Sequence, residues 1–213
     1  YGNRVGVYRL MDTLSERGIK ASAAVNAAVA RRYPSLMQAV ADAGWEVMAH
    51  GLDMEQLHHG GIDAAVEAEW IASAIAIMEE TTGQRPRGWL SPARSQSWTT
   101  LDLLQQQGIE YCCDWDNDEL PYRMRAGEGE IVAMPVSPDI DDHSILIRNH
   151  HSEASFTQQL IDQFDVLHEE SLEGGRILSL GLRPWVIGQP YRIGALEEAL
   201  DHIMGHEGVW PAT

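Results

Sequence analysis

Cysteine is scarce in this sequence, and the two cysteines present, Cys112 and Cys113, are adjacent. Neighbouring side chains of a strand point to opposite faces, so this pair is poorly placed to form one disulfide. A C-x-x-C motif, which would indicate a metal or redox site, is also absent. We therefore expect reduced thiols and a cytoplasmic location.

Basic residues and long apolar runs are scarce as well. Lysine and arginine number 15 against 32 aspartates and glutamates, which gives a formal net charge of −17. Nucleic acids and anionic membranes are bound through clustered cations, so we expect neither as a partner. No stretch approaches the ~20 consecutive apolar residues that a membrane-spanning helix needs.

The sequence also lacks a G-x-G-x-x-G segment after a first strand, which argues against a Rossmann fold. What recurs instead is an amphipathic helix, a glycine and a short apolar run, a pattern that predicts a parallel sheet with outer helices. We expect left-handed helix caps at Gly18, Gly44, Gly83, Gly108, the Gly174-Gly175 pair and Gly205. We expect about six strands, over residues 19–25, 45–50, 87–90, 109–115, 131–135 and 177–182. Residues 116–130 are expected to form a long functional loop.

Polar side chains follow the predicted strands at their carboxyl ends. His50 comes directly after the apolar run of residues 45–49 and before Gly51. In parallel α/β proteins the carboxyl ends of the strands border the crevice in which ligands bind. Acids, arginines and tryptophans gather at the other predicted strand ends too, and such a mixture suits a small polar substrate or a glycan.

Five segments together give the chain a resemblance to the polysaccharide deacetylase superfamily, the NodB-homology family. They are RVGVYRLMDTL, the His50-Gly51 pair, TGQRPRGWLSPARS, CDWDNDELPY and RPWVIGQPYRI. The chain most resembles the branch that contains peptidoglycan-deacetylase-like proteins and metal-independent allantoinases. This resemblance implies an α/β fold, a distorted (β/α) barrel of parallel strands with outer helices, lacking its first strand. We expect residues 1–213 to form a single NodB-like catalytic domain that is truncated at both ends.

The resemblance implies hydrolysis of a carbon–nitrogen bond other than a peptide bond, usually an N-acetyl amide on a sugar. In the family a carboxylate activates water, often on a divalent metal held by one aspartate and two histidines, and a histidine protonates the leaving amine. Here Met54 stands in place of the second metal histidine and Arg183 in place of the histidine before the last Pro-Trp, and the paired aspartates would precede Tyr1. The usual triad is therefore incomplete: the cofactor is unknown, zinc is possible through His50, and we favour a metal-free site.

Candidate site residues follow from these positions. We expect catalytic roles for His50, Asp53, Arg94, Asp114 and Asp118. We expect substrate binding by Trp89, Ser91, Trp115, Asn117, Arg183 and Trp185. Structural alternatives stay open: a buried histidine at a strand end, a helix N-terminal cap for Asp53, a surface ion pair for Arg94 and core packing for the tryptophans. Solvent-exposed positions are expected for His58 and His59, and a solvated turn for Asp139, Asp141 and Asp142.

Three functions are compatible with this pattern. The first is deacetylation of an N-acetyl sugar by a polysaccharide deacetylase-like hydrolase. The second is hydrolysis of a cyclic amide or ureide, as an allantoinase performs it, which would suit an incomplete metal triad. The third is a non-catalytic module that binds a carbohydrate or another small polar ligand. Each function leaves a homo-oligomer open.

Overall fold

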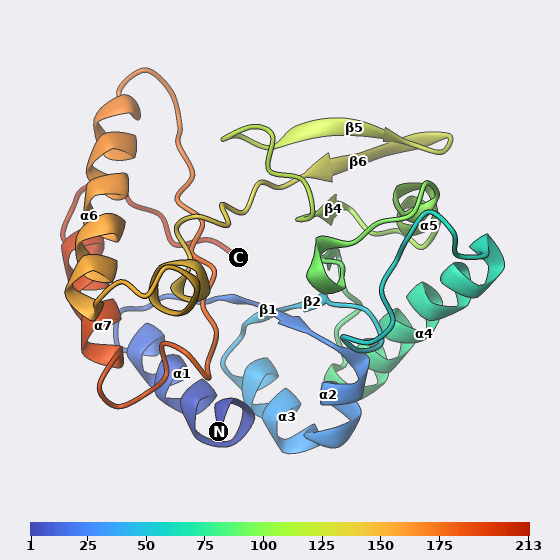
Figure 1. Cartoon of the computed structure of the whole chain (residues 1–213), viewed down its shortest axis with the longest axis horizontal. Coiled ribbons are helices and arrows are strands. Elements are labelled where there is room, and N and C mark those ends of the chain that lie inside the picture. The colour runs from blue at the N-terminus through green and yellow to red at the C-terminus, as the bar shows by residue number, and fades with distance from the viewer. The chain divides into compact units, whose positions relative to one another are not determined.

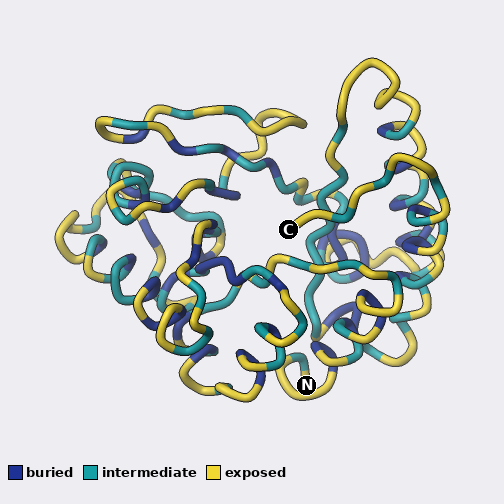
Figure 2. Tube along the Cα trace, turned by 180° about the vertical axis from the view of Figure 1, so that it is seen from behind, coloured by how far each residue is buried: buried dark blue, intermediate teal, exposed yellow.

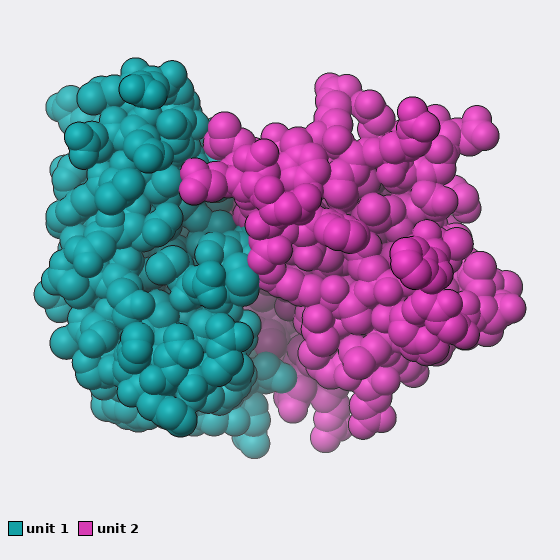
Figure 3. All heavy atoms as spheres, turned by 45° about the horizontal axis from the view of Figure 1, so that its top comes forward, with its two compact units in different colours: residues 1–20, 136–212 teal, residues 21–135, 213 magenta.

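The computed structural model describes all residues from Tyr1 to Thr213, and the chain forms two compact units (Figure 1, Figure 3). Unit 1 consists of Tyr1–Lys20 and Val136–Ala212, and unit 2 consists of Ala21–Pro135 with Thr213. None of the helices combines the length and the hydrophobicity needed to span a bilayer. The expectation of one catalytic domain over the whole chain stays a prediction.

Unit 2 alternates strands and helices, as the hydrophobic pattern predicts. Its six strands lie in one sheet in the order β1-β2-β3-β4-β6-β5. Its elements are β1 (Ser22–Val25), α2 (Ala27–Arg32), α3 (Pro34–Asp42), β2 (Glu46–Ala49), α4 (Ala64–Thr82), β3 (Gly88–Trp89), the 3₁₀ turn η2 (Pro92–Arg94), α5 (Thr100–Gln106), β4 (Tyr111–Cys112), β5 (Tyr122–Ala126) and β6 (Gly129–Ala133).

Strand register places the carboxyl ends of the parallel strands side by side. Val25 pairs with Ala49, Ala49 with Trp89, and Trp89 with Cys112, which in turn pairs with Ala133. The residues that follow this row therefore emerge at one edge of the sheet. The predicted α/β fold with parallel strands and outer helices is confirmed, and β1 and β5 form the two edges of the sheet.

Two predicted elements differ from the structure. The expected loop over residues 116–130 contains β5, which pairs antiparallel with β6 as a hairpin. Exposed and half-buried residues alternate along most of β5, so this edge strand is too polar to show as an apolar run. The expected strand over residues 177–182 forms only an isolated bridge between Gly181 and Asp141, because an apolar run becomes a strand only where a neighbouring backbone pairs with it.

The glycine caps were predicted correctly in four of six cases. The Gly174-Gly175 pair follows a helix that already ends at Glu170, and neither glycine has a positive φ. Gly18, Gly44, Gly83 and Gly108 have φ angles of 66°, 68°, 70° and 79°. Gly205 instead has a φ of −73° and donates its N–H to the Asp201 carbonyl. Helix α7 (Ile193–Met204) ends just before Gly205. Because Gly205 itself keeps a helical φ, the residue after it stays close to the last helical turn.

The core of unit 2 lies between the helices and the sheet. Helix α4 buries Ile71, Ala74, Ile75 and Met78 along one stripe. This helix contacts α2, α3, α5 and β2, while α5 contacts β5 and β6. Buried and exposed stretches alternate along the helices accordingly (Figure 2). The polar faces of the helices are exposed to solvent. We therefore expect ligands to bind at the strand ends and at the loops that follow them.

Unit 1 is largely helical and contains η1 (Gly2–Gly6), α1 (Val7–Ser15), η3 (His143–Arg148), α6 (Glu153–Glu170) and α7 (Ile193–Met204). Helices α6 and α7 pack side by side (Figure 1). Phe156, Leu160 and Phe164 are buried on α6, and Leu196 and Leu200 on α7. The 3.6-residue spacing of these side chains explains why both helices were predicted from the sequence.

Candidate functional site

His50 follows β2 directly, and the neighbouring strands hold it in place. Its backbone N–H donates to the Val25 carbonyl at 3.0 Å. Its ring Nδ1 lies 2.6 Å from the Leu90 carbonyl oxygen. Because a carbonyl only accepts, Nδ1 carries the proton, and the lone pair of the neutral ring is on Nε2. If His50 transfers a proton or binds a ligand, Nε2 is therefore the atom that does so.

Gly51 allows the loop after β2 to approach the loop after β3. Its φ is +68°, and a Cβ at this position would lie 2.6 Å from Cγ of Pro92. Any other residue would be strained in this conformation and would displace the proline. Asn26, at the end of β1, donates its side-chain N–H to the His50 carbonyl oxygen. Residues at the ends of three neighbouring strands thus hold His50 in its position.

The residues next to His50 do not fit the divalent metal that the family resemblance implies. Met54 occupies the position of the second histidine ligand, and its Sδ lies 3.9 Å from Nδ2 of Asn26. A thioether is a poor ligand for a hard or borderline ion. Catalytic zinc takes three protein ligands, and the thioether of Met54 and the amide of Asn26 at this strand end are both poor ligands for it. We derive no catalytic step through a metal at this position.

The loop after β3 is fixed by the loop after β4. Asp114 accepts hydrogen bonds from the Ser91 backbone N–H at 2.7 Å and from Nε2 of Gln96 at 2.6 Å. Oε1 of Gln96 accepts from Nε1 of Trp115 at 3.2 Å. Nη1 of Arg94 lies 3.2 Å from Oδ2 of Asp116. The predicted residues Arg94, Asp114 and Trp115 therefore belong to one polar cluster at the strand ends.

Backbone strain is concentrated in the same loop. Ala93 and Arg94 have φ angles of +53° and +52°, in the left-handed region that favours glycine. Each such residue costs about 1–3 kcal/mol and persists only where its surroundings enforce it. The hydrogen bonds of Asp114 to this loop provide that enforcement. Strain of this kind gathers at functional sites, which supports the assignment of Arg94 to the site.

Other predicted site residues of unit 2 form structural contacts, and their predicted site roles stay predictions. Trp89 and Ser91 have no exposed surface, and Nε1 of Trp89 donates to Oγ of Ser91 at 2.8 Å. Their side chains are core groups, which favours the packing alternative, and their predicted substrate contacts stay predictions. Oδ1 of Asp53 accepts two backbone N–H groups at 2.8 and 3.0 Å, and Asp118 accepts one at 3.1 Å. Asn117 accepts from the Tyr122 hydroxyl at 2.7 Å. Asp53 and Asp118 thus stabilise turns.

Arg183 and Trp185 lie in unit 1. Nη1 of Arg183 contacts Oδ2 of Asp141 at 3.0 Å and Oδ1 of Asp142 at 3.1 Å. Both aspartates are buried, so the expectation of a solvated turn is wrong for them: the guanidinium group supplies their counter-charge. Trp185 is 49% exposed, with its ring edge-on to His143. Both predicted substrate contacts, by Arg183 and Trp185, stay predictions.

The Asp142 carboxyl makes stability dependent on pH. Burial raises its pKa from the ordinary 3.8 to about 6, although hydrogen bonds from Arg183 oppose the rise. The folded state therefore holds the proton more tightly, and the stabilisation is present below pH 4 and is lost as pH rises through about 6. We expect the free energy of unfolding to fall by about 3 kcal/mol over this range. Urea denaturation at a series of pH values measures the change.

Asp142→Asn removes this titration, and Asp139→Asn serves as its control because Asp139 is exposed. The free energy of unfolding of wild type, measured relative to that of Asp142→Asn, should fall as the pH increases from 4 to 7. Parallel stability profiles of wild type and Asp142→Asn would contradict the assignment.

A buried polar network in unit 2 escaped prediction from the sequence. His58 is 3% exposed, and its Nδ1 lies 2.8 Å from Oε1 of the fully buried Glu67. Glu67 also accepts hydroxyl hydrogen bonds from Ser97 and Thr100 at 2.5 Å and from Thr99 at 3.0 Å. Burial raises the pKa of Glu67, but these hydrogen bonds outweigh burial, and the net pKa lies below its usual value. The network holds an ionised carboxylate in the core.

The expectation of an exposed His58 is wrong, because its ring packs edge-on against Trp70 and Trp89. His59 is exposed as expected. The His58 backbone N–H also donates to Oγ of Ser95 at 3.1 Å, so the network ties the start of α4 to the loop that carries Arg94. The sequence carries a signal for this network in residues 95–100, because four of these six residues are serine or threonine.

Comparison with known proteins gives consistent results. A family model described as polysaccharide deacetylase matches residues 2–112. The peptidoglycan deacetylase of Helicobacter pylori (strain ATCC 700392 / 26695) is 25% identical over 241 residues, which cover 98% of this chain and 81% of that protein. The crystal structure of Puue allantoinase matches with a TM-score of 0.90 and 31% identity, covering 100% of this chain and 70% of that chain.

A second solved structure, described as a probable polysaccharide deacetylase from Pseudomonas aeruginosa PAO1, matches with a TM-score of 0.88 and 33% identity. The match covers 100% of this chain and 71% of that chain. These similarities include the strands that place His50 and the loop of Arg94.

Proposed function

Because this chain belongs to the polysaccharide deacetylase family, we propose that it removes the acetyl group from an N-acetylated sugar. The family and the hydrolase class predicted from the sequence are confirmed. The position of His50 is the observation that carries the proposal. Its Nδ1–H is held by the Leu90 carbonyl at 2.6 Å, so the proton-accepting nitrogen Nε2 has a defined direction at the end of a parallel strand.

Hydrolysis of an amide requires three actions. Water adds to the carbonyl carbon, the resulting oxyanion is stabilised, and the nitrogen takes up a proton as the carbon–nitrogen bond breaks. We assign proton transfer to Nε2 of His50. We assign anion binding to Arg94, whose guanidinium group is oriented by Asp116. The ring of Trp115, which is 41% exposed, is the candidate surface for stacking on a sugar.

Hydrolysis of a cyclic ureide is the second candidate. Two observations favour it: Met54 in place of a metal-ligating histidine, and 31% identity over the whole chain to a protein described as an allantoinase. The ring opening uses the same elementary steps, because it also breaks an amide-type carbon–nitrogen bond. The two functions differ in the leaving product: a deacetylase releases acetate, whereas a ureide hydrolase releases no second molecule.

The test is an assay of the purified chain with N-acetylglucosamine oligomers and, in parallel, with allantoin. Acetate release from the oligomers is expected under the first proposal, and loss of allantoin without acetate under the second. Each reaction is repeated after exhaustive chelation, and we expect no loss of rate because the surroundings of His50 do not fit a metal. Binding of the oligomers without any turnover would overturn both proposals in favour of a non-catalytic carbohydrate-binding module.

We further propose that the protein acts in a reducing compartment, the cytoplasm. Cys112 and Cys113 are free and buried. Burial raises the pKa of Cys113 to about 12, so this thiol stays protonated and unreactive near neutral pH. Such thiols are typical of proteins that do not rely on disulfides.

A further inference from the structure

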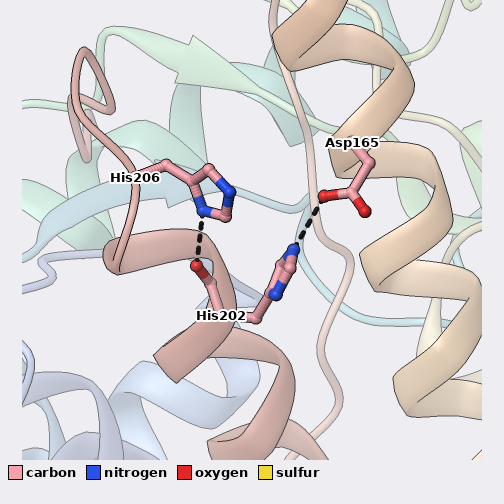
Figure 4. A group of neighbouring side chains, drawn as sticks. All are labelled: Asp165, His202 and His206. Atoms are coloured by element: carbon pink, nitrogen blue, oxygen red, sulfur yellow. Dashed lines mark hydrogen bonds and ion pairs between the residues drawn. The ribbon is translucent and has the colours of Figure 1, made fainter.

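A cluster of imidazole and carboxylate groups lies in unit 1, where α6 packs against α7 (Figure 4). It consists of Asp165 on α6, His202 in the last turn of α7, and His206 just beyond α7. Each side chain offers one ligand atom, and these three atoms all lie within 4.8 Å of one another. None of the three residues belongs to the polar cluster around His50.

The packing of the two helices fixes the backbone of this cluster. Phe164, next to Asp165, is buried, and so is Ile203, next to His202. Gly205 keeps a helical φ of −73°. His206 therefore follows His202 by four residues and returns to the same face of α7. The two imidazole rings have their centroids 4.8 Å apart.

Hydrogen bonds determine which ring nitrogens can bind an ion. Nδ1 of His206 lies 2.8 Å from the His202 carbonyl oxygen. A carbonyl only accepts, so Nδ1 carries the proton and the lone pair is on Nε2. Donation of one ring N–H to a backbone carbonyl is the arrangement that orients metal-binding histidines. Nε2–H of His202 donates to Oδ1 of Asp165 at 2.7 Å, and both atoms point into the space between the helices (Figure 4). A metal ion that binds both atoms takes the place of this proton, which is released to solvent.

We propose that Asp165, His202 and His206 bind one borderline divalent transition-metal ion, with Zn²⁺ as the reference ion. Two imidazole nitrogens and one carboxylate oxygen form a donor set that suits zinc, while Mg²⁺ and Ca²⁺ prefer oxygen ligands alone. Tetrahedral coordination with bonds of about 2.0–2.2 Å brings ligand atoms to roughly 3.3–3.5 Å from one another. Small rotations of these exposed and half-buried side chains are enough for that approach.

The ion joins α6 to α7 at their C-terminal ends. In the absence of an ion, Asp165 and His202 form only a surface pair, which contributes little to stability. This surface pair alone would not require His206 as a third group beside it. It would also not require the His206 tautomer in which Nε2 is unprotonated. His168 adjoins the cluster, with its ring centroid 5.1 Å from that of His206. Because His168 is not among the residues whose ligand atoms all lie within 4.8 Å of one another, water is assigned to the fourth position.

Titration of the purified, chelator-treated chain with ZnCl₂ by isothermal titration calorimetry tests this site. We expect binding of one ion by wild type and an affinity lowered by about tenfold or more in His202→Gln and in His206→Gln. Titration with Co²⁺, followed by its visible absorption, reports tetrahedral nitrogen and oxygen coordination in wild type and its loss in the variants. Circular dichroism verifies that each variant is folded.

Matched controls keep the test specific. His151→Gln and Asp162→Asn alter exposed residues of unit 1 outside the cluster, and they should bind zinc as wild type does. His50→Gln should also retain the site. Zinc should raise the midpoint of thermal unfolding in wild type but not in His206→Gln, because an ion that binds only the folded state stabilises it. The proposal is overturned if wild type binds no zinc, or if His50→Gln abolishes binding while His202→Gln and His206→Gln preserve it.

Discussion

His50→Ala is expected to lower the rate of carbon–nitrogen bond hydrolysis by about 10²- to 10⁴-fold, the usual contribution of a general acid or base. The substitution removes the imidazole ring that follows β2, including Nε2 and the contact of Nδ1 with the Leu90 carbonyl. The His50 N–H donates to the Val25 carbonyl, and the His50 carbonyl accepts from the Asn26 side chain. Both bonds use only main-chain atoms of residue 50, so the fold should be preserved. Steady-state kinetics, with kcat and KM measured separately, provide the measurement.

His59→Ala is the matched control for this variant, because His59 is exposed and forms no contact with the β2 strand end. Its kcat should equal that of wild type. If His50 transfers a proton, His50→Ala should lower kcat more than it raises KM, and it should remove one limb of the pH–rate profile. Turnover of His50→Ala at the wild-type rate would exclude His50 from the chemistry while leaving the assignment of the chain to its family intact.

Glu67→Ala is expected to lower the free energy of unfolding by about 3 kcal/mol or more, because several buried donors lose their acceptor and each unsatisfied buried donor costs about 1–3 kcal/mol. The carboxylate has no exposed surface and accepts hydrogen bonds from three hydroxyl groups besides its contact with His58. Its loss leaves the buried His58 and these donors without their acceptor and opens a cavity in the core. Urea denaturation monitored by circular dichroism measures the effect.

Glu69→Gln is the control, since Glu69 is exposed on the same helix, and it should change stability by less than about 0.5 kcal/mol. The pKa of Glu67 is lowered in the folded state relative to the ordinary 4.5. Its stabilising contribution is therefore present above pH 4.5 and is lost as pH falls through the folded pKa. The deficit of Glu67→Ala should shrink in acid. Equal stability of Glu67→Ala and wild type at neutral pH would refute the structural role of this network.

Much of the fold and part of the candidate site could be predicted from local patterns. The 3.6-residue spacing of apolar side chains marks α4, α6 and α7, and glycines mark where several helices end, because both features act over a few residues. The position of His50 was predictable for the same reason: an apolar run followed by a polar residue indicates a strand end. The placement of Arg94 and Asp114 after β3 and β4 also followed from strand order.

What the sequence by itself determined about this protein is its family and the polar edge of a parallel sheet that carries His50. The tertiary structure alone decided which polar residues are buried: His58 lies against two tryptophans, and Asp142 pairs with Arg183. It also decided that Asp165 and His202, 37 positions apart, stand side by side. Periodicity tells which face of an element is apolar, but it carries no information on which other face will cover it.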